Sequence, residues 1–116
     1  MASLGMYGPF KLDNETIGLQ VTKTSAGNYA FGRKGERGTF LVNYVGRSDS
    51  DVAERLRSWI GETRSPLFKY SYASSAKAAF EKECVNYHDF SPPGNDVHPA
   101  RPDGTTWKCP RCNIFG

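Results

Sequence analysis

The stretch over residues 27–46 constrains the fold more than any other part of the chain. It reads GNYAFGRKGERGTFLVNYVG, two apolar and aromatic runs at 27–32 and 39–46 on either side of a loop of glycines and charges. Short apolar runs bounded by glycine-rich turns are typical of a β-hairpin. Each run has a tyrosine close to a glycine, Tyr29 in the first and Tyr44 in the second. Pairing of the two strands is therefore expected to bring two phenols close together on one face.

Two helices and a third strand are expected after the hairpin. Residues 40–42 are consecutively apolar, which suits a central strand. The serines and acids at 48–51 can bind the free N–H groups of a first helical turn, and apolar residues then recur at helical spacing over 52–60. Residues 67–72 alternate aromatic and polar side chains, as a half-buried strand does, and a second helix follows over 75–90. The order β-β-α-β-α predicts an α+β fold, a small antiparallel sheet of about three strands with flanking helices.

The chain has the length of a single domain, with less regular segments at both ends. We expect residues 1–23 to form an N-terminal arm, in which alternating apolar residues at 17–21 favour a short edge strand. Residues 24–90 then form the domain itself. Residues 91–116 are rich in Pro, Gly, Asp and Asn, and a tail of this composition needs something to order it.

Composition and charge restrict the class of protein. An apolar content of 38% with 13% aromatic residues is that of a folded domain. No apolar run approaches the ~20 residues of a membrane helix, and the N-terminus lacks a signal-peptide pattern. Three cysteines, an odd number, disfavour a disulfide framework and favour a reducing compartment, the cytoplasm. A net charge of +3 permits nucleic-acid binding without demonstrating it.

The cysteine spacing predicts a metal centre in the tail. Cys109 and Cys112 are separated by two residues, so both thiolates can reach one ion, and structural zinc takes four tetrahedral ligands. Cys84 and His88 stand at i, i+4 on one face of the expected second helix and complete a set of three cysteines and one histidine. His98 is the alternative histidine. Without a metal, Cys84 is a core residue and the two tail cysteines lie in a bare turn; with one, four protein ligands make the zinc structural.

The hairpin and both helices resemble the GIY-YIG nuclease superfamily. Gly27-Asn28-Tyr29 stands for its first motif and Tyr44-Val45-Gly46 for its second, and Arg55 lies at the place of its helix arginine. The resemblance implies Mg²⁺- or Mn²⁺-dependent hydrolysis of a nucleic-acid phosphodiester, with DNA as the expected partner. Trp59 stands where the family commonly has His or Tyr, and Asn28 stands where it has an apolar residue.

The resemblance also implies roles for individual residues. Tyr29 or Tyr44 would position and deprotonate the attacking water, once a nearby cation lowers the pKa of the phenol. Arg55 would hold the scissile phosphate and stabilise the charge that grows in the transition state. Glu83 would hold the Mg²⁺ or Mn²⁺ ion, with Glu81 as the alternative carboxylate.

Basic residues around the hairpin can contact phosphate without reading sequence. They are Arg33, Lys34, Arg37 and Arg47.

The alternative function is a zinc-stabilised module of the same fold that binds nucleic acid or protein without cleaving it. In that case the tyrosines are ordinary strand aromatics and the acids are exposed helix residues. No specificity domain is recognisable, so a nuclease would read nucleic-acid shape or depend on a protein partner for targeting.

Overall fold

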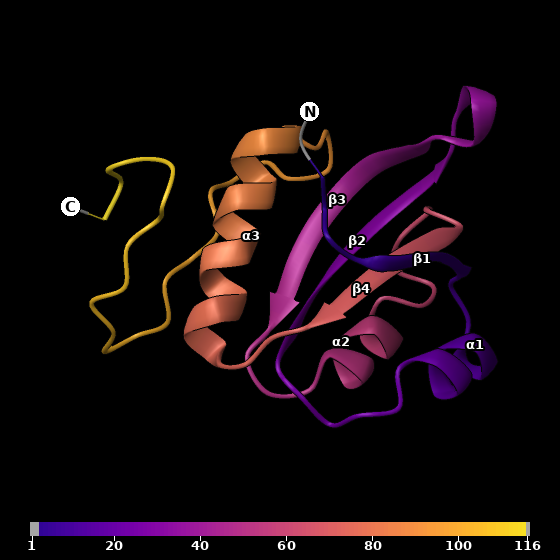
Figure 1. The fold of residues 1–116 in the computed structure, drawn as a ribbon, viewed down its shortest axis with the longest axis horizontal. Coiled ribbons are helices and arrows are strands. Elements are labelled where there is room, and N and C mark those ends of the chain that lie inside the picture. Colours follow the sequence, from indigo (N-terminus) through magenta and orange to yellow (C-terminus); the bar gives the residue numbers. More distant parts are fainter. Residues whose placement is uncertain (1–2, 116) are drawn as a thin grey trace.

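The computed structural model describes residues 3–115 and has the expected α+β architecture. The elements in order are β1 (Tyr7–Lys11), α1 (Asn14–Gln20), β2 (Gly27–Lys34), β3 (Phe40–Ser48), α2 (Val52–Ser58), β4 (Leu67–Tyr72) and α3 (Ala76–Phe90). The four strands form one antiparallel sheet in the order β1-β4-β2-β3 (Figure 1). The sheet thus has one strand more than the sequence predicts, because β1 joins its edge.

The predicted hairpin is present as β2 and β3. A short 3₁₀ turn at Glu36–Gly38 connects them, with Arg37 and Gly38 at positive φ of 59° and 74°. The expectation of a central second strand is wrong. β3 is the edge strand, and its Leu41 is 43% exposed, while β2 and β4 occupy the centre.

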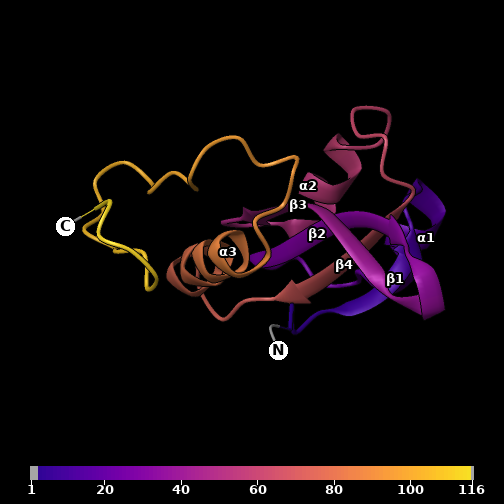
Figure 2. The same ribbon diagram turned by 90° about the horizontal axis from the view of Figure 1, so that it is seen from above.

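The sheet is covered on both faces, by α1 and α2 on one side and by α3 on the other (Figure 2). Phe31 packs with Ile17 of α1 and Leu56 of α2 in one core cluster. The preceding residue, Ala30, packs in a second cluster against which Tyr87 of α3 lies. Successive side chains of a strand point to opposite faces, so the two clusters are the two sides of the sheet.

The N-terminal segment contains a helix where alternating apolar residues had favoured a strand. Asp13 caps α1 by accepting a hydrogen bond from the Thr16 backbone N–H at 2.7 Å. Ile17 and Val21 are buried at i, i+4 spacing, whereas Leu19 is 70% exposed. Ile17, Leu19 and Val21 are compatible with the two-residue repeat of a strand and with the repeat of a helix. The Asp13 cap together with burial at i, i+4 favours the helix.

The two later helices begin where the sequence predicts. The Asp51 side chain accepts a hydrogen bond from the Glu54 N–H at 3.2 Å, and Ser75 Oγ accepts one from the Ala78 N–H at 3.1 Å. These caps fix the first turns of α2 and α3 and therefore the directions from which both helices approach the sheet.

The tail over residues 91–115 contains no helix or strand, yet it is docked on the domain. The Asn95 side chain accepts from the Val45 N–H at 2.9 Å and donates to the Val45 carbonyl at 3.0 Å, and the Gly94 N–H donates to the Asn43 carbonyl at 2.7 Å. The tail thereby covers the exposed edge of β3, which would otherwise present unpaired backbone groups. Within residues 3–115, no helix has the length and apolar character needed to cross a membrane.

Candidate active site and candidate metal centre

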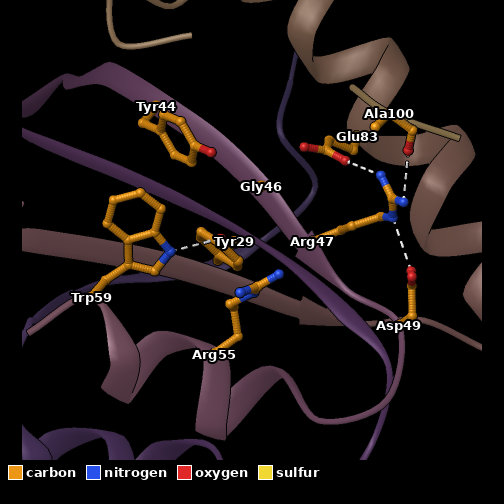
Figure 3. Close-up of a pocket in the computed structure, with 9 residues that line it drawn as sticks. All are labelled: Tyr29, Tyr44, Gly46, Arg47, Asp49, Arg55, Trp59, Glu83 and Ala100. Atoms are coloured by element: carbon orange, nitrogen blue, oxygen red, sulfur yellow. Dashed lines mark hydrogen bonds and ion pairs between the residues drawn. The ribbon is translucent and has the colours of Figure 1, made fainter. Parts of the chain in front are cut away.

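A polar cavity of about 350 Å³ opens at the β3 edge of the sheet, between α2 and α3 (Figure 3). Its lining residues are Tyr29, Tyr44, Gly46, Arg47, Asp49, Arg55, Trp59, Glu83 and Ala100. The four residues to which the resemblance assigns catalytic roles are all present, although they come from β2, β3, α2 and α3. The alternative carboxylate, Glu81, is not part of the lining.

Gly46 allows the two tyrosines to meet in this cavity. It lies directly opposite Tyr29 in the β2–β3 register, and a Cβ at position 46 would overlap the Tyr29 ring. Since no side chain is present there, the Tyr29 ring lies against the β3 backbone. The Tyr29 and Tyr44 rings are stacked, with their centroids 6.5 Å apart. The sequence prediction of two phenols on one face of the hairpin is thus confirmed.

Gly46→Ala is expected to destabilise the fold by about 1–3 kcal/mol, the usual cost of overpacking. Gly18→Ala is the matched control, because its Cβ would meet only the flexible end of Arg57 at 3.7 Å. At this position inside α1, alanine is expected to raise the free energy of unfolding by up to about 1 kcal/mol. Chemical denaturation of both variants checks the prediction, and equal stabilities would contradict it.

Trp59 holds Tyr29 in place. Its indole Nε1–H donates a hydrogen bond to the Tyr29 hydroxyl at 2.9 Å, and its ring packs 5.0 Å from that of Tyr44 (Figure 3). Burial raises the pKa of Tyr29 well above its ordinary value, and the bond from Trp59 offsets only part of this effect. Tyr29 therefore keeps its proton at neutral pH. Trp59 acts as a hydrogen-bond donor at the position where the GIY-YIG nuclease superfamily commonly has His or Tyr.

Tyr44 is the more accessible of the two phenols. It is half-buried, and its hydroxyl points across the cavity toward the side that carries Glu83 (Figure 3). Burial raises its pKa, and the negative charge of Glu83 raises it further, while Arg55 acts in the opposite direction. The side chains alone thus leave both phenols protonated, so a general-base role for either tyrosine requires a bound cation.

Glu83 projects from α3 into the cavity and is 8% exposed. Its Oε1 accepts a hydrogen bond from Arg47 Nη1 at 2.6 Å. Arg47 also donates from Nε to Asp49 Oδ1 at 2.9 Å and from Nη2 to the Ala100 carbonyl at 2.8 Å (Figure 3). Burial raises the pKa of Glu83, and the paired Arg47 guanidinium lowers it to a smaller extent.

The sequence predicts a basic patch of Arg33, Lys34, Arg37 and Arg47, but the structure places Arg47 far from Arg33. Arg33 pairs with Leu41 near the hairpin turn, whereas Arg47 pairs with Asn28 six residues further along β3. At ~3.3 Å per residue, this separation is about 20 Å. Arg47 instead lines the cavity. The sequence carries no signal for the contribution of Ala100, because any residue supplies a backbone carbonyl.

A second cluster lies where the tail meets α3. The ligand atoms of His88, His98, Cys109 and Cys112 all lie within 4.8 Å of one another. The Nε2 atom of His88 is buried and has no hydrogen-bond partner among residues 3–115. His98 Nε2 lies 3.4 Å from Cys112 Sγ. These four residues can bind a metal ion.

The cluster differs from the expected ligand set in one member, because it contains His98 and does not contain Cys84. Cys84 is fully buried and packs with Phe80 and Cys109, and burial raises the pKa of its thiol. Burial also acts to raise the pKa of Cys109, but hydrogen bonds from the Arg111 backbone and from His98 outweigh it and lower that pKa to about 6.

The two sites share α3, which contributes Glu83 to the cavity and His88 to the metal cluster. They are further connected through the tail, since His98 belongs to the cluster and Ala100 lines the cavity.

Comparisons of the chain with protein-family models, with curated proteins and with solved structures each found no match.

Proposed function

We propose that this protein is a divalent-metal-dependent endonuclease that hydrolyses phosphodiester bonds of nucleic acid, with DNA as the substrate to test first. The observation that carries the proposal is the cavity in which Tyr29, Tyr44, Arg55 and Glu83 meet. The GIY-YIG resemblance named these four residues from short motifs spread over the chain, and four different elements bring them to one place. The protein would find its target by recognising the shape of the nucleic acid or by binding a protein partner that directs it there.

The carboxylate of Glu83 suits Mg²⁺ or Mn²⁺. Mg²⁺ commonly uses one or two carboxylates and completes its shell with substrate phosphates and waters. Glu83 Oε1 is taken by Arg47, whereas its other oxygen points toward the cavity and makes no hydrogen bond within residues 3–115 (Figure 3). A metal bound there would lower the pKa of a coordinated water and offset the charge of the phosphate.

The other cavity residues have complementary tasks. Arg55 makes no ion pair with any residue from 3 to 115 and points into the cavity, so its permanent charge is available for the scissile phosphate (Figure 3). The Tyr44 hydroxyl can hydrogen-bond the attacking water and orient it. Tyr29 is held by Trp59 and packs against Tyr44, which restricts the Tyr44 ring.

For the ion in the tail cluster we propose zinc. Two thiolates and two imidazoles are the nitrogen and sulfur donors that zinc prefers, and four protein ligands leave no open position for chemistry. The ion is therefore structural and ties the tail to α3 through His88. None of the three cysteines forms a disulfide within residues 3–115, which suits a reducing compartment, and we place the protein in the cytoplasm.

Tyr44→Phe is expected to lower the rate of metal-dependent cleavage by about 10²–10⁴-fold, because it removes the hydroxyl that acts on the water. The measurement is cleavage of duplex, nicked, flapped and branched DNA with Mg²⁺ or Mn²⁺. Tyr7→Phe is the matched control, since Tyr7 lies on β1, is 63% exposed and is not part of the cavity. A folded protein that cuts none of these substrates, yet binds DNA in a salt-sensitive manner, would reject the nuclease and favour the binding module.

A further inference from the structure

Arg47 is fixed by one hydrogen bond from each of its three guanidinium nitrogens. Nε donates to Asp49, Nη1 to Glu83 and Nη2 to the backbone carbonyl of Ala100. The guanidinium also lies over the Phe80 ring, 5.2 Å from its centroid. Its orientation is thus defined by β3, by α3 and by the tail together.

The bond to Ala100 decides how Arg47 meets Glu83. Arginine and carboxylate commonly form two parallel hydrogen bonds, one to each carboxylate oxygen. Here one N–H of Nη2 donates to the Ala100 carbonyl, which holds the guanidinium in an orientation in which only Nη1 donates to Glu83 and only one carboxylate oxygen is taken. Without that carbonyl, the guanidinium is free to turn so that Nη2 donates to the second oxygen, and neither oxygen of Glu83 would then be free of Arg47 for a metal ion.

Two features on the N-terminal side of Ala100 contribute to its position. Asn95 attaches the tail to the edge of β3 through two hydrogen bonds with Val45. His98, two residues before Ala100, belongs to the metal cluster. The segment between Asn95 and Ala100 contains no helix or strand, so an ion bound by His98 supplies a second anchor next to Ala100.

We propose that the metal centre of the tail regulates the cavity: when occupied, it holds the Ala100 carbonyl on Arg47 and keeps the second oxygen of Glu83 available to a divalent cation. Arg47 is then a positioning residue that transmits the state of the tail to Glu83. This inference rests on the proposed function, because it assigns regulation to the same cavity.

The test measures Mn²⁺ binding by electron paramagnetic resonance, in protein carrying one equivalent of zinc and in protein stripped of zinc by a chelator. Mn²⁺ prefers oxygen ligands and is not expected to replace zinc among thiolates. Binding lost in Glu83→Gln is assigned to the cavity. Removal of zinc is expected to weaken this Glu83-dependent binding by at least about fivefold, the lower end of ordinary coupling between sites.

Arg47→Lys is the control for the proposed route. A lysine ammonium cannot form the two-pronged pair, so removal of zinc should leave Mn²⁺ affinity unchanged in this variant. A loss as large as in the wild type would overturn the role of Arg47.

His98→Ala covers the case in which zinc-free protein unfolds. Zinc can remain on His88, Cys109 and Cys112 with a water as fourth ligand, while the anchor beside Ala100 is lost. We expect the same weakening of Mn²⁺ binding. Arg111→Ala is the matched control: it removes the 3.1 Å ion pair between the tail and Asp89 but leaves His98 in place, and should not change Mn²⁺ binding.

Unchanged Mn²⁺ affinity in folded zinc-free protein or in His98→Ala would overturn the inference. The absence of any Glu83-dependent Mn²⁺ binding in the zinc-loaded wild type would also overturn it, because the second oxygen of Glu83 would then not be available to a cation even with zinc bound. Cleavage is measured separately. Zinc-dependent Mn²⁺ binding in a protein that cuts no nucleic acid would reject the proposed nuclease and retain the coupling.

Discussion

Glu83→Gln is expected to reduce metal-dependent cleavage by on the order of 10²–10³-fold or more, the cost of removing one strong electrostatic contact from a transition state. Glutamine has nearly the same shape, and its amide oxygen can still accept the hydrogen bond from Arg47 Nη1. The variant is therefore expected to remain folded while losing the negative charge that a divalent cation needs. Steady-state cleavage at matched concentrations of folded protein measures the effect.

Glu81→Gln is the matched control for this experiment. Glu81 lies on the same helix two residues earlier and does not line the cavity, so its replacement should leave the rate unchanged. If cleavage survived in Glu83→Gln and fell in Glu81→Gln, the metal-binding carboxylate would be assigned to the wrong residue. Survival in both variants would point to a contaminating nuclease.

Cys109→Ala is expected to lower zinc affinity by more than the 10–100-fold that loss of an outer-shell partner costs, because it removes a ligand itself. With the ion lost, residues 98–115 keep weaker contacts with the domain, among them the Arg111–Asp89 ion pair and the packing of Trp107 on Phe80. We therefore expect rapid proteolysis of the tail while the sheet persists. Zinc content by atomic absorption and limited proteolysis are the two measurements.

Cys84→Ala separates the set of His88, His98, Cys109 and Cys112 from the one that the sequence spacing suggests. Cys84 packs in the small core between α3 and the tail, so its truncation should lower stability slightly and leave one bound zinc per chain. His98→Ala should instead weaken zinc binding. The reverse result, with zinc lost in Cys84→Ala and fully retained in His98→Ala, would restore the set of three cysteines and one histidine.

The hairpin and the helix starts were predictable because their signals are local. Glycines next to Tyr29 and Tyr44, and the caps at Asp51 and Ser75, act within a few residues of the chain. The N-terminal helix shows the limit of such signals. Ile17, Leu19 and Val21 fit both a strand and a helix, and the Asp13 cap together with the burial of Ile17 and Val21 in the core distinguishes the two.

Some features of the candidate site could likewise be predicted from local sequence, and others depend on tertiary contacts. The residue types of the cavity could be named from motifs, since a short motif states which side chain stands at which position. The clustering of His98, and not Cys84, with His88, Cys109 and Cys112 depends on how the tail packs on α3, and no spacing rule contains that information. The same holds for Arg47, whose partners Asp49, Glu83 and Ala100 lie on three different segments.

The sequence by itself determined the α+β class, the meeting of two tyrosines on one face of the hairpin, and the chemistry available to the chain. These follow from backbone preferences and side-chain periodicity, which act over one turn or one strand pair. The tertiary structure alone decided that β3 lies at the edge of the sheet, that the tail covers this edge through Asn95, and that Ala100 reaches the cavity. Such contacts join residues far apart in the chain, and they depend on the packing of whole elements.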